Sequence, residues 1–188
     1  ATVSCGDYLQ GGTAGAISGG QYIVDVMRSV GYDAVTLGNH EFDNGIDELA
    51  RRVRNLNVPV VCANYDFSGS ALEGLVKPYV ILEKAGKKIG VIGLLTDVTS
   101  VVDKDIVDQL DYRHPAEVAN EYARILKIDQ RCDLVICLTH LGYEGENYND
   151  PELAASTRNV DVIVGGHSHT LLKDHKVVYN LDGEPVTI

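Results

Sequence analysis

The stretch "TLGNHEFDNG", residues 36 to 45, places a group of polar side chains directly after a short apolar segment. The residues just before Gly38, "DAVTL", have the apolar and β-branched character of a buried strand. An amide, an imidazole and two carboxylates follow at once: Asn39, His40, Glu41 and Asp43. These are the groups that proteins use to bind metal ions and to move protons. The stretch therefore predicts a functional site at the end of a strand.

Three other predicted strands end in the same kind of residue. Asp7 follows "TVSC", His140 ends "LVICLTH", and "VDVIVGG" leads into "HSH" with His167 and His169. Because the carboxyl ends of strands in such folds gather ligand-binding loops at one edge, we expect these side chains to lie together. One carboxylate, one amide oxygen and several imidazoles suit Zn²⁺, Mn²⁺, iron or nickel better than Ca²⁺.

Taken singly, each of these residues has a plainer interpretation. Asp7 or Asn39 alone is typical of a turn or a helix cap, and His140 alone is typical of a partly buried histidine. Their joint placement at four strand ends favours a metal site. The predicted ligands are Asp7, Asn39, His140, His167 and His169.

Strand-like and helix-like segments alternate along the chain. Strands are predicted at residues 2–5, 33–37, 58–63, 79–95 with a hairpin at Gly86, 132–140, 160–166 and 175–188 with a hairpin at Asp182 and Gly183. Helices are predicted at residues 20–30, 46–56 and 115–128, with a short one after Pro151. This order predicts an α/β layered fold, with mixed β-sheets flanked by helices, in a single domain over residues 1–188.

Charge and composition exclude some classes of function. The chain has 27 acidic and 16 basic residues and a net charge of -11, which disfavours binding to a nucleic-acid polymer through its phosphates. A small phosphorylated ligand remains possible where metal ions supply positive charge. No apolar run is long enough for a membrane span. The four cysteines lack CxxC spacing and are predicted to be core residues. His114 and His175 are predicted to be surface residues. The charged run "LARRVR" is predicted to be the solvated face of a helix.

The chain begins and ends within predicted strands, "ATVSC" and "EPVTI". We therefore expect it to be a piece of a longer protein.

Four motifs, "GDYLQGG", "GNHEFDNG", "CLTHLGY" and "GGHSHT", occur in the order and approximate spacing of the calcineurin-like metallophosphoesterases. From Cys5 to about Thr170 the chain resembles the bacterial 5'-nucleotidase and UDP-sugar hydrolase branch of that family. The resemblance implies two divalent metal ions, Zn, Mn or similar, bridged by Asp7. It places Asn39, His140 and His167 on the second ion and His169 on the first.

The same resemblance implies roles for His40 and Asp43. His40, held by Asp43, would stabilise the phosphoryl transition state or protonate the leaving group. The resemblance gives Glu41 no direct role, and we expect Glu41 to support the loop. The two ions would share a water whose deprotonated form attacks phosphorus. The implied substrate is a nucleoside monophosphate or a nucleotide sugar, and the implied location is the periplasm or the cell surface.

Two parts of the family's pattern have no counterpart in residues 1–188. One is a first strand carrying "DxH", which completes the first-ion site, and the other is a C-terminal nucleotide-recognition domain. We therefore expect a metallophosphoesterase catalytic domain truncated at both ends, with an incomplete first-ion site and low activity by itself. Two alternatives stay open: another phosphodiesterase or phosphatase of the superfamily, and a non-catalytic binding domain.

Overall fold

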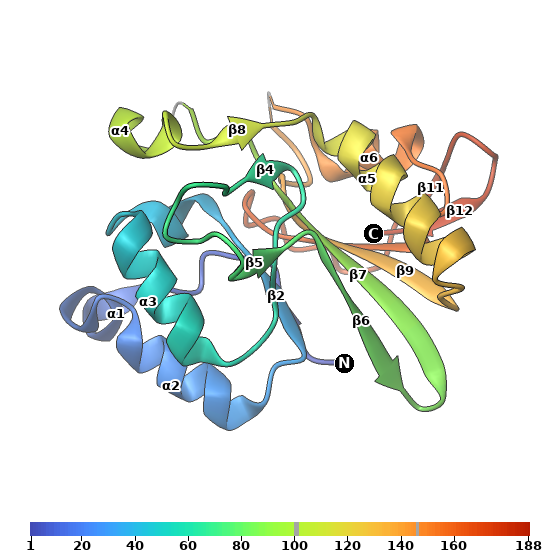
Figure 1. Ribbon diagram of the computed structural model, residues 1–188. Coiled ribbons are helices and arrows are strands. Elements are labelled where there is room, and N and C mark those ends of the chain that lie inside the picture. The colour runs from blue at the N-terminus through green and yellow to red at the C-terminus, as the bar shows by residue number, and fades with distance from the viewer. Residues whose placement is uncertain (100–101, 146) are drawn as a thin grey trace.

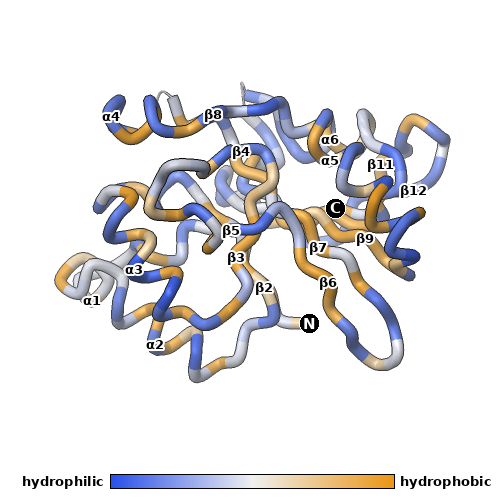
Figure 2. The backbone as a smooth tube through the Cα atoms, in the orientation of Figure 1, coloured by the Kyte–Doolittle hydropathy of each residue, from blue (hydrophilic) through white to orange (hydrophobic). Residues whose placement is uncertain are grey.

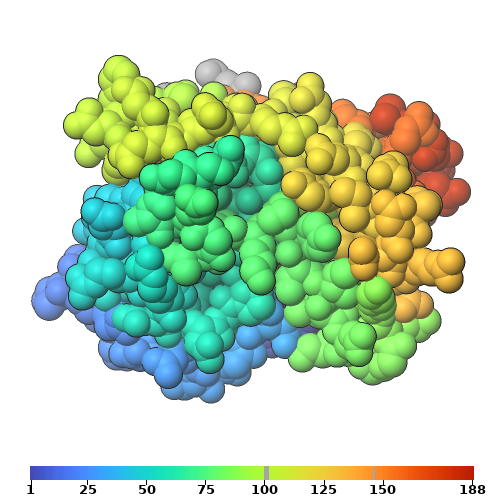
Figure 3. Space-filling view, in the orientation of Figure 1, coloured from blue at the N-terminus to red at the C-terminus, as the bar shows by residue number. Residues whose placement is uncertain are grey.

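The computed structural model describes residues 1–99, 102–145 and 147–188. Two β-sheets pack against each other, and helices cover their outer faces (Figure 1). As a space-filling surface, the blue-to-green part and the yellow-to-red part of the chain form adjoining halves of one body (Figure 3). Across the described ranges, no helix has both the length and the apolar character needed to cross a membrane.

The first sheet is parallel throughout. Its order is β1-β2-β3-β5, with β1 at Val3–Ser4, β2 at Ala34–Thr36, β3 at Val60–Val61 and β5 at Val76–Lys77. The helices that cover it are α2 (Gln21–Val30) and α3 (Ile46–Leu56), and the short helix α1 (Gly12–Ser18) lies next to α2. Helix α2 buries an apolar stripe that includes Val24 and Met27, and helix α3 buries one that includes Leu49 and Val53. The spacing follows the helical period of about 3.6 residues.

The second sheet is mixed. Its order is β11-β12-β10-β9-β7-β6. The parallel strands are β7 (Lys87–Leu95), β9 (Leu134–His140), β10 (Val162–Gly165) and β12 (Pro185–Thr187), and β6 (Tyr79–Lys84) and β11 (Val177–Tyr179) are antiparallel to their neighbours. Helix α5 (Pro115–Arg124), continued by a π-helical turn at Ile125–Asp129, and helix α6 (Asp150–Ser156) pack on this sheet.

Small elements lie outside the two sheets. Strands β4 (Tyr65–Asp66) and β8 (Asp111–Tyr112) form an antiparallel pair, α4 spans Lys104–Val107, and the 3₁₀ helix η1 spans Asn39–Phe42.

The two sheets share an apolar layer. Ala34, Val61, Val91 and Leu138 form a buried cluster, whereas Val35, the neighbour of Ala34, packs against the helices on the other face. This alternation follows the two-residue period of a strand. At Gly93 of β7 a Cβ atom would overlap the carbonyl of Val61, so glycine allows the sheets to approach. The hydropathy of the backbone shows the same apolar centre (Figure 2).

Most of the predicted elements are confirmed, including all four helices, both hairpins and the mixed sheet. The expectation of a solvated "LARRVR" face is wrong for Arg52, which is buried and donates to the carbonyls of Ser18 and Gly19. Helix α1 was not predicted, because "GTAGAIS" has no apolar stripe. Cys62, Cys132 and Cys137 are buried free thiols, as expected, and Cys5 is partly buried.

Candidate metal centre

The loops after β1 and β2 meet backbone to backbone. Asp7 has a left-handed φ of 57°, and the preceding Gly6 has a φ of 88°. A Cβ atom at Gly6 would overlap the backbone of Gly38, and a Cβ atom at Gly38 would overlap Oδ1 of Asp7. Glycine at both positions is therefore what brings Asp7 next to the "GNHE" segment.

Glu41 joins these two loops through its buried carboxylate. Oε2 accepts hydrogen bonds from the backbone N–H groups of Gly38, at 2.6 Å, and Asp7, at 2.7 Å, and Oε1 accepts from Leu9 at 3.0 Å. Burial raises the pKa of Glu41, and the three N–H groups limit that rise. Glu41 thus supports the loop, as the sequence predicts, and holds both loops at once.

Three of the predicted ligands converge from three strand ends. One ligand atom from each of Asp7, His140 and His167 lies within 4.8 Å of the others. His140 ends β9 in the second sheet, whereas Asp7 follows β1 in the first. The predicted rim therefore exists, but it is formed by two packed sheets instead of the edge of one.

The ring of His140 has a fixed tautomer. Its Nδ1 lies 2.5 Å from the carbonyl oxygen of Cys5, and because a carbonyl only accepts, Nδ1 must be the protonated donor. In the neutral ring, Nε2 then carries a lone pair. In this neutral form Nε2 lies 3.0 Å from Oδ2 of Asp7 with no proton between the two atoms, and it is buried. A histidine whose second nitrogen is fixed by a carbonyl is typical of metal ligands.

The electrostatics of this pair favour a positive charge. Burial lowers the pKa of His140, but the carboxylate of Asp7 outweighs burial and the pKa is raised. Burial would raise the pKa of Asp7, but His140 outweighs it and the pKa is lowered. The space between the two side chains therefore stabilises a cation, which can be a proton or a metal ion.

Asn39 supplies an independent sign of a bound cation. Its Oδ1 is buried and has no hydrogen-bond donor among the described residues. An unsatisfied buried oxygen costs about 1 to 3 kcal/mol, and a divalent cation is a partner that such an oxygen accepts. The carboxylate, amide oxygen and imidazoles present here fit a transition-metal ion or Zn²⁺.

The two histidines of "GGHSH" occupy different places. His167 lies with its ring centroid 4.9 Å from that of His140, and burial together with the neighbouring His140 lowers its pKa. A low pKa keeps the imidazole neutral, which is the form that binds metal. His169 is exposed and lies outside the three-residue cluster, although it lines the same cavity. Its role as a ligand of the first ion stays a prediction.

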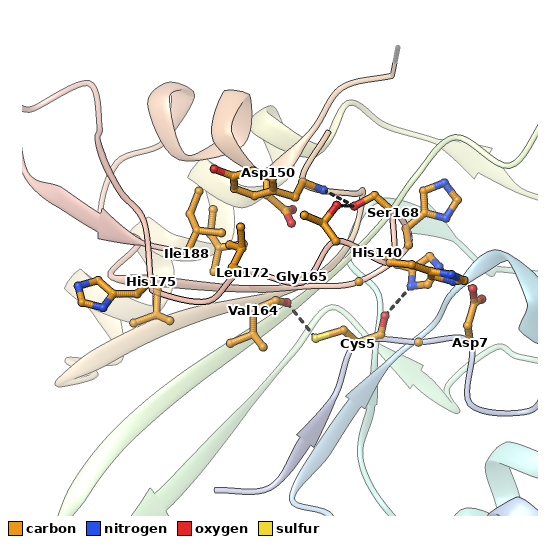
Figure 4. Close-up of a pocket in the computed structure, with 18 of the residues that line it drawn as sticks. Cys5, Asp7, His140, Asp150, Val164, Gly165, Ser168, Leu172, His175 and Ile188 are labelled. Atoms are coloured by element: carbon orange, nitrogen blue, oxygen red, sulfur yellow. Dashed lines mark hydrogen bonds and ion pairs between the residues drawn. The ribbon is translucent and has the colours of Figure 1, made fainter. Parts of the chain in front are cut away.

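A cavity of about 590 Å³ adjoins the converging ligands. Figure 4 shows Asp7 and His140 toward one end of the cavity and His175, Leu172 and Ile188 toward the other. The metal-competent end is thus continuous with an end where Leu172 and Ile188 lie beside His175.

His40 lies beside the ligands and does not join them. Its backbone N–H donates to Oδ1 of Asp7 at 3.0 Å, and its Nδ1 lies 2.9 Å from Oδ2 of Asp43. The hydrogen bond to Asp43 raises the pKa of His40, and the side chain is 53% exposed. A proton-bearing, accessible imidazole next to Asp7 suits the predicted role at a leaving group.

Asp150 is a member of the cavity wall that the sequence analysis did not single out. It is buried, and it accepts a hydrogen bond of 2.6 Å from Oγ1 of Thr139. Burial raises its pKa to about 6. In the sequence it precedes Pro151 at the start of a helix, and an acid there is typical of an exposed first turn, so no local signal marks it. His114 and His175 are exposed, as predicted.

Two packed sheets with metal-competent residues at their shared rim define the chain as an α/β domain with a candidate metal site. The calcineurin-like phosphoesterase family matches residues 1–171. The chain belongs to this family.

Its relatives include several nucleotidases. It is 38% identical over 151 residues to a 5'-nucleotidase of Vibrio cholerae, and 35% identical over 172 residues to the protein UshA of Yersinia enterocolitica. These alignments cover 76% and 85% of the chain but 27% and 31% of the relatives. The chain thus spans about a third or less of their length.

Solved structures agree on the fold. The chain matches a 5'-nucleotidase precursor of Thermus thermophilus with a TM-score of 0.88 and 34% identity, over 98% of this chain and 38% of that one. It matches an NAD nucleotidase of Haemophilus influenzae with a TM-score of 0.85 and 31% identity, over 99% and 39%. The predicted metallophosphoesterase fold is confirmed.

Proposed function

We propose that the chain forms the catalytic core of a metal-dependent hydrolase that releases phosphate from nucleoside 5'-monophosphates or cleaves nucleotide sugars. The observation that carries the proposal is the convergence of Asp7, His140 and His167 beside the unsatisfied Oδ1 of Asn39. The nucleotidase relatives support the nucleotide substrate class.

Five residues would hold the ions: Asp7, Asn39, His140, His167 and His169. Bound divalent ions supply positive charge that activates a water and stabilises the charge that develops on the phosphoryl oxygens. Asp7 is placed to contact both His140 and the His40 backbone, so it links the ion-binding side chains to the proton donor. The fixed Nδ1–H of His140 keeps its lone pair directed at Asp7 and away from the Cys5 carbonyl.

His40 is proposed to carry the proton that the departing alkoxide needs. Asp43 accepts from its Nδ1, which leaves Nε2 as the nitrogen that acts on the substrate. The raised pKa of His40 favours the proton-bearing form of its ring.

We also propose that the chain is part of a longer exported protein, on the strength of the family resemblance and of the greater length of the relatives. Strand β1 lies at the edge of the first sheet, and Cys5 and Asp7 after it line the cavity. We propose that an upstream strand pairs with β1 and supplies the residues that complete the first-ion site. The chain alone is then expected to bind one ion more tightly than the second.

The test is hydrolysis by the longer protein, with the chain alone in parallel, in Mn²⁺ or Zn²⁺. The substrates are 5'-AMP, a nucleotide sugar and bis-p-nitrophenyl phosphate. Release of phosphate from 5'-AMP supports the proposal. Cleavage of the diester alone would assign a phosphodiesterase, and inactivity on all three would assign a binding domain. Fractionation of cells that produce the longer protein tests its export.

A further inference from the structure

Gln10, in "GDYLQGG", contacts the acid that holds His40. Its Nε2 lies 2.5 Å from Oδ2 of Asp43, and the same oxygen lies 2.9 Å from Nδ1 of His40. A carboxylate oxygen only accepts, so the Gln10 amide must present its NH₂ group to Asp43. One carboxylate oxygen therefore receives two N–H groups, one from the amide and one from the imidazole.

The orientation of His40 depends on few contacts. Its side chain is 53% exposed, and among the described residues its ring forms a single hydrogen bond, which is to Asp43. The Asp43 side chain is itself a third exposed and follows the short 3₁₀ helix η1. Among the described residues, the Asp43 carboxylate accepts from one side chain besides His40, and that side chain is Gln10. Without Gln10, that carboxylate is free to rotate away from His40.

Gln10 also belongs to a different loop from His40. It follows Leu9, whose backbone N–H is fixed by Glu41, in the segment that begins with Asp7. The Gln10 contact therefore ties the position of the His40 ring to the loop that carries the predicted bridging carboxylate. A proton donor must lie within hydrogen-bond reach of the leaving group, so its position relative to Asp7 matters for the rate.

We propose that Gln10 is a positioning residue for the reaction: through Asp43 it holds the His40 imidazole at a fixed position relative to the loop that carries Asp7. This inference rests on the proposed function, since it assigns a role within that site. It predicts a change in turnover and none in metal binding.

The first test is a double-mutant cycle in the longer protein with Mn²⁺ and 5'-AMP. Gln10→Ala should lower kcat about 10-fold, less than the full contribution of a general acid, with KM and metal content within about twofold of the parent. In an Asp43→Ala background the same substitution should have no further effect, because its path to His40 is gone. Equal losses in both backgrounds, or a loss of metal, would overturn the inference.

The leaving group gives a second readout. p-Nitrophenolate departs without a proton, whereas the nucleoside alkoxide needs one, so Gln10→Ala should slow 5'-AMP hydrolysis by a clearly larger factor than p-nitrophenyl phosphate hydrolysis. The matched control is Gln109→Ala, which removes an exposed glutamine whose amide donates to the backbone of Asp105. It should leave both rates unchanged. An equal slowing of both substrates by Gln10→Ala would contradict a role through His40.

A spectroscopic measurement separates this inference from the proposed function. The ¹⁵N shifts of the His40 ring in the metal-free chain report whether Nδ1 carries a hydrogen-bonded proton. Gln10→Ala should shift them toward a mixture of tautomers, and Gln109→Ala should not. If the protein has no activity but Gln10→Ala changes the His40 shifts, the proposed hydrolase is refuted and the Gln10–Asp43–His40 coupling is retained. If Gln10→Ala leaves the His40 shifts unchanged, the coupling is refuted.

Discussion

Nε2 of His140 lies 3.0 Å from Oδ2 of Asp7, and while the His140 ring is neutral no proton lies between the two atoms. The proton of the neutral ring is fixed on Nδ1 by the Cys5 carbonyl, so a nitrogen lone pair and a carboxylate oxygen face the same small space. Two acceptors at this distance repel each other unless a cation lies between them. The relationship leads directly to a prediction about metal binding.

Zn²⁺ or Mn²⁺ should raise the Tm of the chain, and EDTA should reverse the rise. At a free-ion concentration of about 100 times Kd, binding adds about 2.7 kcal/mol to the free energy of unfolding, or roughly 5 to 10 °C for a chain of this size. Asp7→Ala should abolish the rise. Asp108→Asn, at an exposed acid paired with Lys104, is the control and should keep it. A Tm that metal raises equally in Asp7→Ala would place the ion elsewhere.

Gly38→Ala should disrupt the site by steric overlap alone. The φ of Gly38 is -110°, which any residue adopts, but its Cβ would overlap Oδ1 of Asp7. We expect a loss of about 1 to 3 kcal/mol of stability and at least tenfold weaker metal binding by titration calorimetry. The control is Gly15→Ala in α1, where a Cβ meets only ordinary contacts. It should bind metal normally and be as stable as the parent or more so. Normal binding by Gly38→Ala would show that the two loops can separate without cost.

His40→Ala in the longer protein should lower kcat by roughly 10²-fold or more with the metal content kept, which is the scale of a lost general acid. Elemental analysis of the same sample checks the metal. Loss of the ions together with activity would make His40 a ligand instead. His114→Ala is the control, because His114 is also exposed but caps α5 through the N–H of Ala116.

The candidate ligands could be found in the sequence because the signal is local. A buried strand followed by a polar residue shows in the letters, and at Asp7, Asn39, His140 and His167 the strand end also sets the position in space. Helix stripes and hairpin glycines are local in the same way.

Other features depend on packing between distant segments and leave no such signal. The burial of Arg52 follows from its contacts with the end of α1, 33 residues away at Gly19. The close packing of the two sheets depends on the approach of Gly93 to Val61. The contact between Gln10 and Asp43 also spans 33 residues. Nothing in the residues next to these positions distinguishes them from ordinary surface glutamine, arginine or strand glycine.

Glu41→Gln should destabilise the chain although it changes one atom. The carboxylate accepts three N–H groups, two of them at Oε2, and an NH₂ group on either side of the amide would face at least one N–H. We expect a loss of about 2 to 4 kcal/mol, since hydrogen bonds to charged groups contribute about 1.5 to 3 kcal/mol each. Urea unfolding measures it.

The control for Glu41 is Glu73→Gln, at an exposed glutamate that accepts from the N–H of Gly69. A surface change of this kind should alter stability by about 0.5 kcal/mol or less. Metal affinity should fall in Glu41→Gln and not in Glu73→Gln, because only Glu41 holds the Asp7 and Gly38 loops together. Equal stability of the two variants would show that these loops do not need the shared acid.

Asp150 should make the stability of the metal-free chain depend on pH. Its pKa rises from an ordinary value of 3.8 to about 6 on folding, because burial disfavours the charged form. Between these two values the folded chain binds more protons than the unfolded chain, so the contribution of Asp150 to the free energy of unfolding falls as the pH rises through this window. Above this pH window, the ionised, buried Asp150 lowers the free energy of unfolding by an amount on the order of 2 to 3 kcal/mol. Asp150→Asn keeps an oxygen that can accept from Thr139 and removes this cost.

The measurement is the Tm of Asp150→Asn minus that of the parent, in EDTA, from pH 4.5 to pH 7.5. The difference should increase with pH and level off above about pH 7. Asp66→Asn is the control, because hydrogen bonds from Ser68 lower the pKa of the exposed Asp66 below its ordinary value of 3.8, so that its contribution is complete above that pH and its Tm difference should stay flat from pH 4.5 to pH 7.5. A difference for Asp150→Asn that stays constant over this range would mean that the buried carboxyl is ionised at pH 4.5, and that the wall of the cavity is more polar than its contacts indicate.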